Sequence, residues 1–129
     1  MMPEVTHINI FVEDQDKALK FYTEKLGFTV AEDLELSGIR WLTLNANQEG
    51  SFYIILAAAT TPEDKMLIGK QGGSCPLLGF ESHDLDKDYE TMKAKGVEFL
   101  GAPENHQWGK SATFKDLYGN MVYIVQSPK

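Results

Sequence analysis

Hydrophobic and polar residues alternate over residues 5–12, near the start of the chain. One side of this stretch is aliphatic, and the other side carries His7, Asn9 and Phe11. A period of two is typical of a β-strand whose two faces meet different surroundings. We therefore predict a strand that packs its aliphatic face against a helix and turns a partly polar face elsewhere.

An amphipathic helix is predicted directly after this strand. Asp14 or Asp16 can accept a hydrogen bond from the free N–H groups of the first turn, and Gly27 supplies a left-handed stop. Between them, apolar side chains recur at helical spacing: Ala18, Leu19, Tyr22 and Leu26.

The second half of the chain repeats this pattern at a shift of 70 residues. The residues that are identical under that shift include Asp14, Asp16, Lys17, Lys25, Tyr53 and Ile54, which fall on Asp84, Asp86, Lys87, Lys95, Tyr123 and Ile124. In the second helix Asp84 or Asp86 is the predicted cap, Gly96 the stop, and the apolar stripe is Leu85, Tyr89 and Met92. Strand-like runs follow each helix, at residues 28–31, 39–44 and 52–58, and at 97–100, 111–115 and 121–126. The sequence thus predicts an α+β fold of two tandem βαβββ modules, about 3–58 and 75–128, in one domain.

The segment 60–73 shows no clear period and contains Pro62 and the pair Gly72-Gly73. We interpret it as the connector between the modules. Fourteen residues are long for such a connection, so a short helix near residues 63–68 and a lid over a site stay open as alternatives.

Charge and composition narrow the function classes. Nineteen acidic against twelve basic residues give a net charge of −7, which disfavours nucleic acid and mildly favours a cationic ligand. Cys75 is the single cysteine, so no internal disulfide can form. Neither a secretory leader nor an apolar run of membrane-spanning length is evident, and we expect a cytoplasmic protein.

Several stretches together resemble the vicinal-oxygen-chelate superfamily of glyoxalases, bleomycin-resistance proteins and extradiol dioxygenases. They are His7–Val12, residues 17–27 (KALKFYTEKLG), Leu85-Asp86, residues 95–97 (KGV) and residues 108–120 (WGKSATFKDLYGN). The resemblance implies that each module curls into a half-barrel and that the pair encloses a cavity. In that superfamily the cavity often holds a divalent metal, bound by the first and last strands of each half.

The resemblance places the four metal-ligand positions at His7, Tyr53, Leu77 and Tyr123. The superfamily's pattern D-P-D-G-N-x-x-E reads here as residues 116–123 (DLYGNMVY), with Tyr123 in place of the glutamate. A phenol must lose a proton to ligate well, and a leucine offers no ligand atom. We therefore expect no metal and no other cofactor, although a metal held by an unidentified ligand set stays open.

The predicted ligand-binding residues line this cavity: His7, Asn9, Trp41, Tyr53, Leu77, His106, Trp108 and Tyr123. Of these, His7 and Tyr123 are the candidates for proton transfer. His7 is also the expected hydrogen-bond partner of the tyrosine hydroxyls. Residues 104–109 are expected to form a loop that can close on a ligand, and Arg40, opposite Trp41 in strand parity, is expected to be solvated.

Three functions compete at this stage. The leading hypothesis is a binder of a small organic molecule, similar to bleomycin-resistance proteins and without a metal. The second is a metal-dependent lyase, isomerase or dioxygenase of the same superfamily, so enzymatic activity stays open. The third is an accessory protein that acts through its surface. The resemblance also implies a homodimer.

Overall fold

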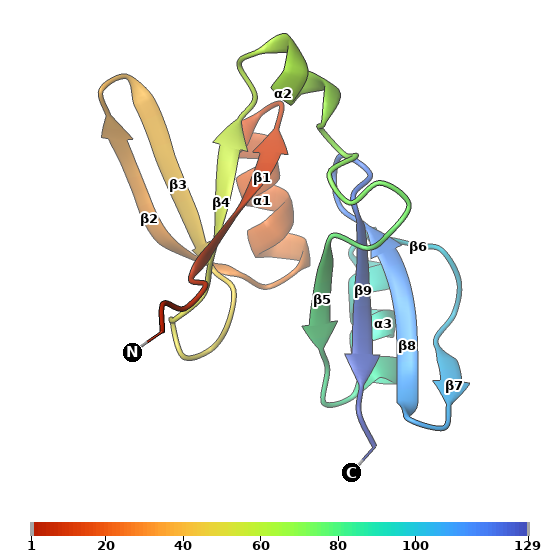
Figure 1. Ribbon diagram of the computed structural model, residues 1–129. Helices are drawn as coiled ribbons and strands as arrows, with labels where there is room; N and C mark the ends of the chain where they lie inside the picture. The colour runs from red at the N-terminus through yellow and green to blue at the C-terminus, as the bar shows by residue number, and fades with distance from the viewer. Residues whose placement is uncertain (1, 129) are drawn as a thin grey trace. The chain divides into compact units, whose positions relative to one another are not determined.

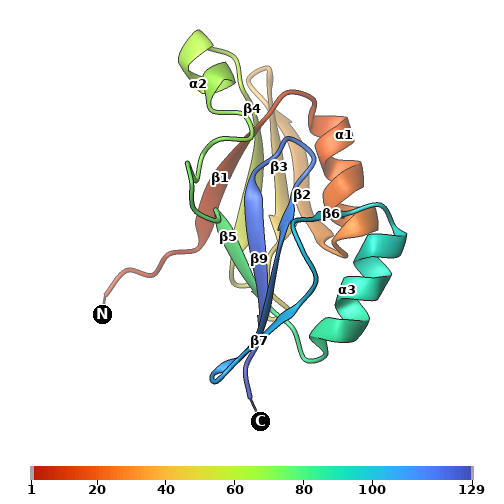
Figure 2. The same cartoon turned by 90° about the vertical axis from the view of Figure 1, so that its right-hand side faces the viewer.

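The computed structural model describes residues 2–128 and divides the chain into two compact units, Met1–Ile68 and Gly69–Lys129. Each unit is a mixed β-sheet with a helix packed on one face (Figures 1 and 2). The predicted α+β class is therefore confirmed. No helix within residues 2–128 combines the length and the apolar character that a bilayer crossing requires.

Unit 1 contains a four-stranded sheet in the order β1-β4-β3-β2. β1 runs parallel to β4, and the other neighbours are antiparallel. The elements are β1 (His7–Val12), α1 (Gln15–Lys20), the π-helical turn η1 (Phe21–Lys25), β2 (Thr29–Leu36), β3 (Ile39–Asn45), β4 (Tyr53–Ala58) and α2 (Pro62–Met66).

Unit 2 repeats this order in a five-stranded sheet, β5-β9-β8-β6, with β7 paired to β8. Again the first strand runs parallel to the last one. The elements are β5 (Leu78–Glu81), α3 (Leu85–Ala94), β6 (Glu98–Phe99), β7 (Glu104–His106), β8 (Gly109–Lys115) and β9 (Met121–Gln126).

The helix caps decide between the predicted alternatives. The side chain of Asp14 accepts from the backbone N–H of Lys17 at 3.0 Å, and that of Asp84 accepts from Lys87 at 3.2 Å. These bonds satisfy one free donor in each first turn. The predicted stop Gly27 has a φ of 81°. Asp14 and Asp84, rather than their neighbours two residues on, are therefore the N-caps.

The core of unit 1 lies between its sheet and the helix α1-η1. The aliphatic face predicted for the first strand is buried there, and β3 and β4 add the same kind of side chain. The fully buried residues include Ile10, Val12, Ala18, Tyr22, Leu42, Leu44, Ile54 and Leu56. We call this side of the sheet the helix face. Burying each leucine, isoleucine or valine side chain contributes about 1.5–3 kcal/mol.

The core of unit 2 is built in the same way, with more aromatic residues. Leu85 and Met92 of α3 are buried, as predicted from their helical spacing. The ring of Tyr89 meets Phe99 edge-on at 4.7 Å, and Phe99 lies 5.4 Å from the buried Phe114. The short strand β6 is thus held by ring contacts on both sides.

Two predicted boundaries are wrong. β2 continues to Leu36 rather than ending at Ala31, because Ser37 and Gly38, with φ of 52° and 79°, form a tight turn into β3. Residues 104–106 form strand β7 rather than a free loop, since they pair antiparallel with β8. Only Gln107 and Trp108 remain as the turn of that hairpin.

The repeat between the units is not a uniform shift. β1 pairs His7 with Tyr53, and β5 pairs Gly79 with Tyr123. By strand register the counterpart of His7 is therefore Gly79, two residues beyond Leu77. The difference arises because β1 has six residues and β5 has four, while the helix caps keep the shift of 70.

Arg40 is not the solvated charge that the sequence predicted. Its guanidinium donates two hydrogen bonds of 2.9 Å to the carboxylate of Asp33 and one of 2.7 Å to Asp16 at the start of α1. Its side chain is 27% exposed. Arg40 therefore ties the β2-β3 hairpin to the helix on the helix face.

One buried side-chain polar atom of the described residues has no hydrogen-bond partner, the hydroxyl oxygen of Thr43. Thr43 lies in the middle of β3, is 1% exposed and pairs with Ile55 of β4. A buried hydroxyl without a partner costs about 1–3 kcal/mol of desolvation.

We expect Arg40→Gln to raise the pKa of the Asp33 carboxyl. In the wild type the hydrogen bond from Arg40 lowers that pKa below its ordinary value of 3.8. A lowered folded-state pKa adds stability above the unfolded-state pKa, and this contribution is lost as the pH falls through the folded-state value. Carboxyl titration by NMR checks the shift, with Lys20→Gln as the control. An unchanged Asp33 titration in Arg40→Gln would contradict the assignment.

We expect Thr43→Val to leave the protein as stable as the wild type or to stabilise it by up to about 1 kcal/mol, because it removes an unpartnered hydroxyl at nearly constant volume. Urea unfolding measures the difference. Thr23→Val is the matched control, since the Thr23 hydroxyl donates to the carbonyl of Leu19 at 2.8 Å and its loss should destabilise. Destabilisation of Thr43→Val by more than about 1 kcal/mol would show that the hydroxyl is paired.

Candidate functional site

The side of the unit 1 sheet opposite the helix face carries the predicted site residues of that unit. Strand pairing aligns His7 of β1, Tyr53 of β4 and Asn45 of β3 in one row across the sheet. Side chains alternate along each strand, so Trp41 projects to the same side as Asn45. We call this side the ring face.

A bulge in β2 brings a carboxylate to the ring face. The register of β2 against β3 shifts between Val30 and Glu32, leaving Ala31 as the extra residue. Glu32 then pairs with Thr43 and shares its side of the sheet. A β-bulge changes the direction in which the side chains after it point.

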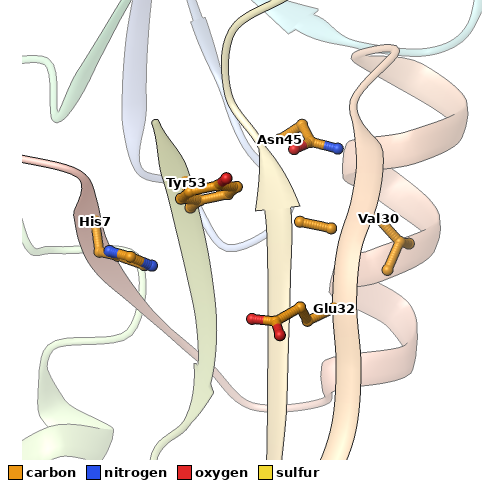
Figure 3. Close-up of a pocket in the computed structure, with 6 residues that line it drawn as sticks. His7, Val30, Glu32, Asn45 and Tyr53 are labelled. Atoms are coloured by element: carbon orange, nitrogen blue, oxygen red, sulfur yellow. The ribbon is translucent and has the colours of Figure 1, made fainter. Parts of the chain in front are cut away.

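The ring face holds an open hollow of about 490 Å³. Figure 3 shows His7 and Tyr53 on neighbouring strands, with the carboxylate of Glu32 reaching over β3 toward them, while Val30 points away. The lining residues are His7, Val30, Ala31, Glu32, Asn45 and Tyr53.

Three aromatic rings gather on this face. The His7 ring lies 5.0 Å from Tyr53 at an interplanar angle of 30°, and 6.2 Å from Trp41 at 46°. We call His7, Trp41 and Tyr53 the ring cluster. Ring faces at this spacing and tilt offer flat apolar surfaces to another planar group.

Hydrogen bonds at the edges of the rings hold the cluster in place. The Nδ1 of His7 pairs with the hydroxyl of Thr6 at 2.7 Å, and the hydroxyl of Tyr53 donates to the carbonyl of Gly50. The expected hydrogen bond between His7 and the Tyr53 hydroxyl is therefore wrong, because each group pairs with a residue close to it in sequence. What the two residues share is a ring contact.

Two polar side chains of the hollow are also tethered. The indole N–H of Trp41 donates to Glu32 Oε1 at 3.0 Å, and the amide of Asn45 donates to the hydroxyl of Thr29 at 2.9 Å. Each bond joins β3 to β2, so the hairpin fixes the orientation of both side chains.

The predicted metal-ligand positions do not fit a divalent metal. In unit 1 they supply one imidazole, His7, and one phenol, Tyr53. In unit 2 the ring of Tyr123 lies over Gly79, which offers no ligand atom. Residues 2–128 contain no group of three or more histidine, cysteine or acidic side chains that could hold a metal ion. We therefore derive no step through a metal.

The remaining predicted residues do not line the hollow. Asn9 pairs with Ile55 and shares the side of His7 in β1. In unit 2 the rings of His106 and Trp108 stack at 4.8 Å and 8°, and the Nε2 of His106 pairs with Ser111 at 2.9 Å. Trp108 is 51% exposed at the tip of the β7-β8 hairpin.

Sequence reasoning missed the contribution of β2. Glu32 and Asn45 line the hollow but were not among the predicted residues. Glu32 was missed because the second strand was expected to end at Ala31, and Asn45 because the third strand was expected to end at Leu44. The alternation of Leu34 and Leu36 with acidic residues is the signal that extends the strand. The position of the bulge has no comparable signal, since no glycine or proline marks it.

Known proteins match the chain over nearly its whole length. YurT of Bacillus subtilis (strain 168), an uncharacterized protein, is 39% identical over 92% of this chain and 94% of its own. The crystal structure of UcmS2 is 32% identical, with a TM-score of 0.85 over 97% of this chain and 98% of that chain.

A second solved structure carries a functional description. TnmS3, an antibiotic binding protein from Streptomyces sp. CB03234, is 30% identical, with a TM-score of 0.81 over 98% of both chains. The family described as Glyoxalase/Bleomycin resistance protein/Dioxygenase superfamily matches residues 4–124. The chain therefore belongs to the glyoxalase/bleomycin resistance protein/dioxygenase superfamily.

Proposed function

We propose that the protein binds a small organic molecule with a planar aromatic part, without a metal, and that the hollow on the ring face of unit 1 is the binding site. The observation that carries this proposal is the ring cluster: His7 and Tyr53 line the open hollow, and the ring of Trp41 lies beside that of His7 on the same side of the sheet.

The arrangement of hydrogen bonds supports binding through ring faces. The Nδ1 of His7, the hydroxyl of Tyr53 and the indole N–H of Trp41 are engaged by Thr6, Gly50 and Glu32 at the edges of the rings. A flat ligand can therefore lie on the faces without breaking these bonds. Because the side chains are already held, little rotamer entropy is lost on binding.

The donor set supports binding rather than metal-assisted chemistry. A divalent ion prefers several imidazole and carboxylate ligands. Here the superfamily's positions supply His7 and two tyrosines, Tyr53 and Tyr123. The description of TnmS3 as an antibiotic binding protein agrees with this assignment, since that protein shares the fold and 30% of its sequence with this chain.

We expect a planar aromatic probe, acridone, to stabilise the protein against thermal unfolding. A ligand at 100 times its Kd adds about 2.7 kcal/mol to the free energy of unfolding. Trp41→Ala should lose most of this effect, because the ligand loses one ring face.

The two tryptophans supply a matched control. Trp108→Ala removes an exposed indole in unit 2 and should leave acridone binding unchanged. Quenching of tryptophan fluorescence by acridone separates the two positions. Saturable quenching is expected in Trp108→Phe, which keeps Trp41, and not in Trp41→Phe. Equal binding by Trp41→Ala and wild type would refute the site, and the absence of any stabilisation by acridone would count against the function.

A further inference from the structure

We infer that the hollow selects organic cations, and that Glu32 is the residue that determines this selectivity. The inference rests on the proposed function and specifies its ligand class: a planar aromatic molecule that carries a protonated amine or amidine. It is argued from the position of one carboxylate and from the distribution of charge in unit 1.

Glu32 is the one acidic residue among the six that line the hollow. The other lining residues are His7, Val30, Ala31, Asn45 and Tyr53. Figure 3 shows its carboxylate directed over β3 to the side on which His7 and Tyr53 lie. A ligand resting on those two rings would therefore have the carboxylate at its edge.

No lysine or arginine within residues 2–128 forms an ion pair with this carboxylate. Its hydrogen-bond donor is the indole N–H of Trp41, a neutral group that bonds to Oε1. Two carboxylate oxygens can accept about four hydrogen bonds, so acceptor capacity remains for a cationic donor. The neighbouring carboxylate Asp33 differs, because it is bonded twice by Arg40 on the helix face.

The hydrogen bond from Trp41 also sets the direction of Glu32. It joins the carboxylate to one ring of the cluster, so the negative charge and the aromatic surface are held together. Aromatic faces attract cations through the ring quadrupole, which adds to the attraction of the carboxylate. An anionic ligand would meet repulsion from both.

Charge is distributed unequally between the two units. Residues 1–68 contain eleven acidic and five basic side chains, which give −6 of the chain's net charge of −7. The basic residues of unit 1 are Lys17, Lys20 and Lys25 on the helix, Arg40 on the helix face and Lys65 on α2. An excess of one sign over a unit raises the concentration of oppositely charged ligands near it.

The experiment compares three planar tricyclic probes by titration calorimetry. The probes are 9-aminoacridine, which is cationic at pH 7, acridone, which is neutral, and anthraquinone-2-sulfonate, which is anionic. We expect 9-aminoacridine to bind at least about fivefold more tightly than acridone, and the sulfonate to bind most weakly. Raising the salt concentration should weaken the binding of 9-aminoacridine and change that of acridone little.

Glu32→Gln tests the residue, since glutamine keeps an acceptor for the Trp41 indole and removes only the charge. We expect the preference for 9-aminoacridine over acridone to fall by about fivefold, with acridone affinity unchanged. Glu35→Gln is the matched control, because it removes the same charge from the same strand but from a residue that pairs with Arg40. It should keep the preference.

The outcomes separate this inference from the proposed function. If acridone binds through Trp41 but 9-aminoacridine binds no more tightly, or if Glu32→Gln keeps the preference, the function stands and cation selection is overturned. If Glu32→Gln weakens all three probes equally, Glu32 only positions Trp41, and cation selection is again overturned. If none of the probes binds, both proposals fail.

Discussion

The parallel pairing of β1 with β4 is the constraint on which unit 1 depends. It places the first strand of the module beside the last and sets His7 opposite Tyr53. With that register fixed, alternation sends one set of side chains to the helix face and the other to the ring face. The buried aliphatic residues hold the register, and the ring cluster results from it. The same strand pairing therefore determines both the buried core and the arrangement of the candidate site.

Much of this arrangement could be predicted from short-range patterns. The caps Asp14 and Asp84 and the stop Gly27 are local signals, because each involves atoms within a few residues. The period of two in the first strand likewise placed Ile10 in the core and His7 on the other face. Such signals do not depend on which strands pair, so a single sequence contains them.

Pairing between distant strands was harder to predict. The shift of 70 residues was correct for the helices and the last strands but not for β5, where the counterpart of His7 is Gly79 rather than Leu77. Two residues fewer in β5 change that register without altering any periodic pattern. Glu32 was missed for a related reason, since its direction depends on how β2 meets β3. Hydrogen bonds that join separate strands, such as the one from Trp41 to Glu32, produce no signal in the spacing of residues along the sequence.

The bulge at Ala31 has a consequence for changes in chain length. If Ala31 paired with β3 as an ordinary strand residue instead of forming the bulge, every side chain of β2 after it would point to the opposite side of the sheet. Glu32 would then face the buried Leu42, and Asp33 would leave Arg40. A one-residue insertion in β2 that was not absorbed would therefore carry the charge of Glu32 to the helix face and remove the carboxylate from the hollow, whereas deletion of Ala31 itself would keep Glu32 opposite Thr43. Substitutions in β2 would therefore be tolerated where such an insertion is not, because only the insertion moves both the carboxylate of the ring face and the contact between Asp33 and Arg40.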